Sequence, residues 1–165
     1  MAVKRKKVSS SVERGIFEQS IAKQNVLQGE IVIPAKEAFG FSRFCKNGFD
    51  ADVIACIAHA MLEKKGERVV SMDLKEIPGA SFDFFVICDG SSGPQVRAIA
   101  DEIEEKVYEQ FGISALHVEG YANAEWILMD FGGVLAHVFL DSVRQHYRLE
   151  ELWGDASTHF YNDND

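Results

Sequence analysis

The turn Gly90-Ser91-Ser92-Gly93 is where residue types and spacing point most directly to chemistry. It separates an apolar run, typical of a strand, from an amphipathic segment typical of a helix. Backbone N–H groups and the positive end of that helix would meet there, and such a spot can hold a phosphate or a carboxylate. Ser92 followed three positions later by Gln95 also matches a capping box, which favours an ordinary capped helix start over an anion site.

A glycine–serine turn after a strand also occurs in nucleotidyltransferases, whose closely spaced carboxylates on the following strands hold two divalent ions. This sequence has no D-x-D after the turn, and Asp101 and Glu102 are neighbours on a helix and point apart. The histidines show neither H-x-x-x-H nor H-E-x-x-H spacing. We therefore expect no metal and no cofactor, and we keep a nucleotidyltransferase-like enzyme using Gly90-Ser91 as the alternative function.

Trp126 lies in a predicted strand, 124–131, whose two faces are both partly apolar. Because side chains alternate along a strand, Trp126, Leu128 and Asp130 share one face, and Glu125 begins the other. Tryptophan is a favoured anchor at protein interfaces, where its wide ring and single donor gain most from loss of water. Buried tryptophan is also common, so core and interface both stay open for this residue.

The apolar periodicity places these residues on a series of strands and helices. It predicts an α/β fold, a mixed sheet of about five strands with helices packed on it. We expect a right-handed parallel crossover between the strands flanking the acidic helix, and an antiparallel hairpin at Gly132-Gly133. The expected strands are 68–74, 82–88, 116–120, 124–131 and 134–140, and the expected helices lie between Asp50 and Gly66, between Ser92 and Gly112, and over 142–153.

Charge is unevenly distributed along the 165 residues, a length that fits one domain. The net charge of −9 divides into +5 for residues 1–49 and −14 for residues 50–165. The acidic body argues against wrapping nucleic acid and favours a basic partner.

Three cysteines without a C-x-x-C pair and the lack of a long apolar run predict a cytoplasmic protein that neither depends on disulfides nor enters a membrane.

Six short segments follow one another along the chain in a specific order. Each segment alone is a weak indication of a family. They are 83–92, 95–101, 118–120, 124–132, 136–139 and 144–156. Together they resemble the ribosomal silencing factor family, also called the Iojap family, from about Asp50 to Ala156. The resemblance implies a fold similar to nucleotidyltransferases without their active site.

The resemblance also implies a function, which is not enzymatic. It is that of a translation repressor, which binds the large ribosomal subunit through ribosomal protein L-fourteen and sterically blocks joining of the small subunit. The interface tryptophan of the family maps onto Trp126. Leu128 and Asp130 are added because they share its face, and the adjoining residues Glu125, Asn123 and Tyr121 complete the expected partner-binding set.

Three segments are expected on this basis. Residues 1–49 form a basic, partly disordered extension, with one short helix near 13–24; residues 50–156 form the silencing factor domain; residues 157–165 form an acidic tail. The extension is a candidate for contact with ribosomal RNA, because basic side chains neutralise phosphates, and a passive tail is the alternative. A homodimer of the free protein also stays open.

Overall fold

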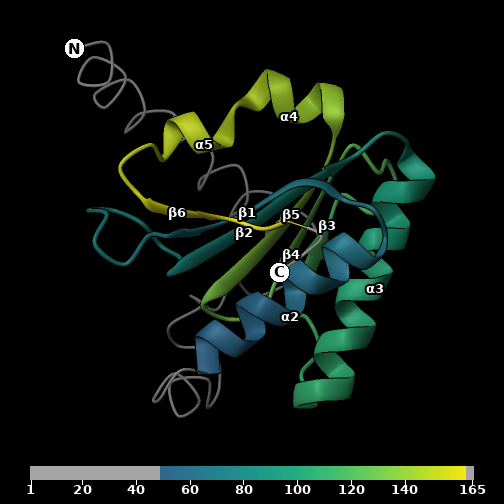
Figure 1. Cartoon of the computed structure of the whole chain (residues 1–165), viewed down its shortest axis with the longest axis horizontal. Helices are drawn as coiled ribbons and strands as arrows, with labels where there is room; N and C mark the ends of the chain where they lie inside the picture. The colour runs from purple at the N-terminus through teal and green to yellow at the C-terminus, as the bar shows by residue number, and fades with distance from the viewer. Residues whose placement is uncertain (1–48, 163–165) are drawn as a thin grey trace, which may run out of the picture.

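The computed structural model of the chain describes residues 49–162, and the predicted extension and its short helix lie outside this range apart from Phe49. The described part is built on one six-stranded sheet in the order β3-β4-β5-β2-β1-β6 (Figure 1). The strands are β1 Glu67–Asp73, β2 Phe84–Gly90, β3 His117–Glu119, β4 Trp126–Asp130, β5 Val134–Leu140 and β6 Ser157–Phe160, and the helices are α2 Phe49–Glu63, α3 Gly93–Phe111, α4 Asp141–Tyr147 and α5 Leu149–Leu152.

The sheet is mixed, as predicted. β2 and β5 pair in parallel at its centre, and the other neighbouring pairs are antiparallel. The hairpin between β4 and β5 turns at Gly132-Gly133, where the N–H of Phe131 donates to the carbonyl of Val134 at 2.9 Å. After α3 the chain continues in β3, which runs parallel to β2 but lies two strands away from β5, at the edge.

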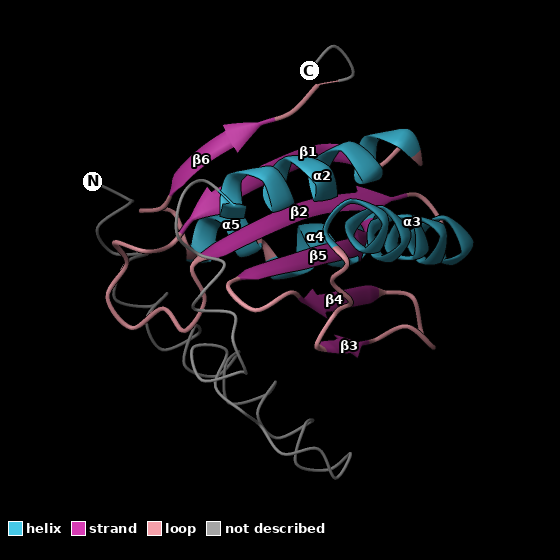
Figure 2. Cartoon of the chain, turned by 90° about the horizontal axis from the view of Figure 1, so that it is seen from below, coloured by secondary structure: helices cyan, strands magenta, loops and turns pink. Residues whose placement is uncertain are grey.

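Helices cover both faces of the sheet. Figure 2 shows α2 and α3 on one side, with α4 and α5 behind the strands. Each layer has its own apolar core. The core under α2 and α3 includes Ile57, Val86, Ile99, Ile127 and Val138. The core under α4 and α5 includes Phe85, Leu128, Leu135, Phe139 and Trp153.

Ser92 and Gly112 cap α3 as predicted, but the side chain of Gln95 accepts from Ser91 rather than from the N–H of Ser92, as a capping box would require. The N–H of Gln95 donates to Oγ of Ser92, and Pro94 occupies the first turn, where a missing N–H is tolerated. Gly112 ends the helix at φ 66°, a left-handed conformation that favours glycine, and its N–H donates to the carbonyl of Tyr108.

Two elements differ from the prediction. Residues 157–160, expected within an acidic tail, form β6 against β1, so the sheet has six strands rather than about five. The single helix expected over 142–153 is interrupted at Arg148, whose φ of 50° is left-handed, and it forms α4 and α5 instead. Within residues 49–162 no helix is both long and apolar enough to cross a membrane.

Candidate functional site

The Gly90-Ser91 turn is a structural junction. Both the N–H and the hydroxyl of Ser91 donate to Oε1 of Gln95, at 2.8 and 3.0 Å. Nε2 of Gln95 donates in turn to the carbonyls of Lys64 and Lys65, in the turn that follows α2. A Cβ at position 90 would lie 3.2 Å from Oε1 of Gln95, so the turn packs closely against this side chain. The polar groups of the turn thus join α2 to α3.

Asp89, just before this turn, lies at the centre of an ion network. It is 1% exposed, and its carboxylate accepts from Arg68 at 2.9 and 2.7 Å and from Nη1 of Arg144 at 2.7 Å. Arg144 is itself buried, and it also binds Glu150 and the carbonyl of Arg68. The network fastens α4 to β1 and β2. Among residues 49–162 no three His, Cys, Asp or Glu side chains form a group that could hold a metal ion.

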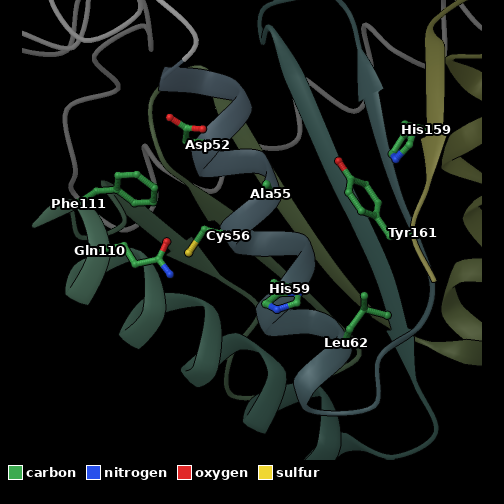
Figure 3. A pocket seen from close by; sticks show the side chains of 9 residues that line it. All are labelled: Asp52, Ala55, Cys56, His59, Leu62, Gln110, Phe111, His159 and Tyr161. Carbon is green, nitrogen blue, oxygen red and sulfur yellow. The ribbon is translucent and has the colours of Figure 1, made fainter. Parts of the chain in front are cut away.

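A groove lies between α2, the end of α3 and β6, away from α4 and the ion network. Figure 3 shows His59 and His159 on its walls and the thiol of Cys56 at its side. Cys56 is buried, and that burial raises the pKa of its thiol, so the thiol is held in its neutral form. The groove therefore offers no activated nucleophile at this cysteine.

Trp126 is half-buried at the start of β4, and its indole is supported on several sides. Its ring stacks on Phe139, with centroids 4.9 Å apart, and lies 4.9 Å from the ring of Tyr147 on α4. Its Nε1–H donates to Nδ1 of His137 at 3.1 Å. The indole is thus held in one orientation with part of its surface accessible.

The other two residues expected on the face of Trp126 support the fold. Leu128 is only 5% exposed and belongs to the core under α4 and α5. Oδ1 of Asp130 accepts from the N–H of Gly132 at 2.8 Å and so shapes the β4–β5 turn. Burial raises the pKa of Asp130, opposed by that hydrogen bond. Of the three residues that share this face, Trp126 is the one that leaves part of an aromatic ring accessible.

The remaining predicted residues are exposed and lie just before β4. Tyr121 is 41% exposed, and Asn123 and Glu125 are also exposed. Tyr147 lies on α4, so no pattern along β4 points to it, and it is 49% exposed beside Trp126. We call these five residues the docking surface, because the function proposed below assigns a partner to them: Tyr121, Asn123, Glu125, Trp126 and Tyr147.

The loop that carries this surface requires a glycine at its start. Gly120 has φ 78°, and an added Cβ would lie 1.9 Å from the carbonyl oxygen of Trp126. Gly120→Ala is expected to lower the free energy of unfolding by about 2–3 kcal/mol, because it adds this clash to the strain of a left-handed alanine. Urea unfolding followed by circular dichroism measures the loss.

The matched control is Gly79→Ala. Its φ of 81° is nearly the same, but nothing lies within 4 Å of the added Cβ. This variant should lose only about 1 kcal/mol, the contribution of the backbone conformation. Equal losses in the two variants would show that Gly120 makes no close approach to β4.

His137 makes the support of Trp126 sensitive to acid. The imidazole is fully buried, and burial lowers its pKa to about 3, whereas an unfolded chain has about 6.5. Between these values the unfolded state binds a proton that the folded state does not. The free energy of unfolding therefore falls as the pH falls from about 6.5 toward 3, by about 2.5 kcal/mol at about pH 4.5.

His137→Gln should remove this contribution, because glutamine stays neutral and still offers an acceptor to the indole of Trp126. Urea unfolding at about pH 7 and about pH 4.5 should give a smaller difference for the variant than for the wild type. The carboxylates titrate in both proteins and cancel in this comparison. The same difference in both would mean that His137 takes up its proton in the folded state.

Sequence comparison finds relatives of this chain in one protein family. The sequence profile described as "Ribosomal silencing factor during starvation" matches residues 50–165. The chain is 44% identical over 107 residues to Ribosomal silencing factor RsfS of Halalkalibacterium halodurans, covering 65% of this chain and 90% of the relative. It is 40% identical over 104 residues to the RsfS of Bacillus subtilis, covering 63% and 86%.

A solved structure agrees with the fold. The crystal structure of a protein from Chromobacterium violaceum superposes with a TM-score of 0.60 at 29% identity, covering 68% of this chain and 92% of that one. The profile match spans the described elements from α2 to β6 almost completely. The profile match thus includes the whole sheet and the segment from Tyr121 to Tyr147.

Proposed function

The chain belongs to the ribosomal silencing factor family, and from this premise we propose that it represses translation by binding ribosomal protein L-fourteen on the large ribosomal subunit. On this proposal it is not an enzyme: bound protein blocks joining of the small subunit by occupying space that the small subunit needs. The observation that carries the proposal is the half-buried indole of Trp126, held in place beside the exposed ring of Tyr147.

Trp126 has the properties of an interface anchor. Residues that dominate binding are most often aromatic or arginine, and they lie in well-packed surroundings that exclude water. The stacking on Phe139 and the hydrogen bond to His137 fix the indole before a partner arrives. Binding therefore orders few additional groups, which favours affinity because less conformational freedom is lost.

Charge around the docking surface favours a basic partner. Glu125 is exposed within it, and residues 50–165 carry a net charge of −14. A protein that binds ribosomal RNA presents basic side chains, and complementary potentials speed the encounter more than they add affinity. We assign most of the affinity to the aromatic residues and the rate of encounter to the acidic ones.

Repression then follows from mass action. If the protein and the small subunit compete for overlapping space, the apparent affinity between subunits falls by the factor 1 + [L]/Kd, where L is the free silencing protein. No chemical step is needed, and release of the protein restores joining. We propose that this competition occurs in the cytoplasm.

The extension is the part of the chain suited to touch RNA. Residues 1–49 carry a net charge of +5, and we propose that they contact ribosomal RNA next to the protein interface, which would add a salt-dependent contribution to affinity. They lie outside the described residues apart from Phe49.

A homodimer of the free protein is a further proposal that size-exclusion chromatography with light scattering tests.

The experiment that tests the assignment of the partner is calorimetry of the full chain with isolated ribosomal protein L-fourteen. We expect saturable binding at one site. Titration with nucleoside triphosphate and magnesium separates the enzymatic alternative: saturable binding there, with none to L-fourteen, would replace the repressor by a nucleotidyltransferase-like enzyme centred on Gly90-Ser91.

A further inference from the structure

We propose that Arg97 and Asp101 of α3 are positioning residues of the docking surface, which hold the loop 120–124 in the shape that presents Tyr121 and Asn123 to the partner. The inference rests on the proposed function and deepens it, because it assigns part of the binding energy to residues outside the surface. The two residues are four positions apart and therefore lie on one side of the helix.

Arg97 forms hydrogen bonds to the backbone of the loop. Its Nε–H donates to the carbonyl of Tyr121 at 3.0 Å, and its Nη2 donates to the carbonyl of Ala122. The planar guanidinium matches two acceptors on successive residues, which a lysine ammonium cannot do with the same directionality. Two adjacent peptide units thus have fixed orientations.

Asp101 forms a hydrogen bond to the side chain of Tyr121 in the same loop. The hydroxyl of Tyr121 lies 2.9 and 3.1 Å from the two carboxylate oxygens of Asp101 and donates to them. This hydrogen bond raises the pKa of the Tyr121 phenol, so the phenol keeps its proton. The ring is therefore oriented along α3 with 41% of the residue exposed.

The ends of the loop are fixed by other means. Gly120 approaches the carbonyl of Trp126 closely, and the N–H of Ala124 donates to the carbonyl of Gly120 at 3.0 Å. Ala124 is 1% exposed with φ 53°, and its side chain packs against the start of α3 at Gly93. Arg97 and Asp101 hold the middle of the loop, between these two ends.

The bonds from α3 to the loop lie at the surface, and hydrogen bonds there add little to global stability. Their expected effect is on binding. A loop that is loose in the free protein must be ordered when the partner binds, and this lowers affinity without the loss of any contact to the partner. Removal of Arg97 should therefore loosen the loop and leave the fold intact.

The first test compares full-length variants in co-sedimentation with purified large ribosomal subunits. Arg97→Ala is expected to bind roughly tenfold more weakly, with a melting temperature close to that of the wild type and faster amide hydrogen exchange confined to residues 120–124. Lys106→Ala is the matched control, since it removes the same charge from the same helix, where Lys106 pairs with Glu63, Glu102 and Glu109. It should bind like the wild type.

Conservative variants separate positioning from charge. Arg97→Lys keeps the charge and one donor and should recover part of the affinity. Asp101→Asn keeps an acceptor for Tyr121 and should bind better than Asp101→Ala. If Arg97→Ala binds as tightly as the wild type, the inference is wrong while the proposed function stands.

A double-mutant cycle distinguishes positioning from direct contact. In a Tyr121→Ala, Asn123→Ala background the loop has nothing left to present, so Arg97→Ala should have little further effect on binding. A full additional loss would show that Arg97 itself touches the partner and would overturn the inference. If the wild type does not bind large subunits, the proposed function fails, and unchanged exchange of residues 120–124 in Arg97→Ala would separately show that Arg97 does not hold the loop.

Discussion

Trp126→Ala is expected to weaken binding to large ribosomal subunits by about thirtyfold or more, the effect typical of an aromatic residue that dominates an interface. The substitution removes the ring that the docking surface is built around and leaves a depression beside Tyr147. Co-sedimentation at increasing concentrations of subunits measures the change. Binding within threefold of the wild type would mean that the partner docks elsewhere.

Trp126→Ala also affects the fold, because the indole stacks on Phe139 and bonds to His137. A second variant therefore separates binding from stability. Tyr147→Ala truncates an exposed ring, 49% accessible, and should weaken binding by about fivefold with little change in the melting temperature. Phe160→Ala is its control, since this ring is 68% exposed on β6 at the opposite edge of the sheet and should not affect binding.

Asp89→Ala is expected to lower the free energy of unfolding by about 3–5 kcal/mol, the range for removing one partner of a buried ion pair. The variant leaves the guanidinium of Arg144, only 6% exposed, without its buried carboxylate. It also frees Arg68, which approaches Asp89 from β1. Urea unfolding monitored by circular dichroism measures the loss, and binding is compared at a temperature where the variant remains folded.

The matched control for the ion network is Arg148→Ala. Arg148 lies just after α4 and pairs with Glu151, and both side chains are about half exposed. An exposed pair of this kind contributes about 0–1 kcal/mol. If Asp89→Ala loses no more than Arg148→Ala, the network around Asp89 does not fasten α4 to the sheet.

Local patterns predicted much of the fold. Ser92 and Gly112 mark both ends of α3 because capping needs only neighbouring residues, and the Gly132-Gly133 hairpin needs only a turn between two apolar runs. β6 has no such signal, since its four residues are exposed and pair with the backbone of β1. The left-handed conformation of Arg148 could not be predicted either, because it is unusual for arginine.

The candidate site was only partly predictable for the same reason. Alternation along β4 placed Trp126 and Leu128 on one face, but the cover provided by α4 and α5 decides that Leu128 is buried. Tyr147 reaches Trp126 from α4, and Asp89 meets Arg144 across 55 positions of sequence. Contacts between distant elements are set by packing, which single-sequence patterns do not encode.

Bound protein is proposed to keep the ribosomal subunits apart, and light scattering of a mixture of the two subunits measures their joining. Purified large subunits are saturated with the full chain, and small subunits are then added. The amount of joined ribosome should fall in proportion to bound protein. Tyr147→Ala should require a higher concentration for the same effect, and Phe160→Ala should not. Unchanged joining with saturated large subunits would contradict the proposed repression.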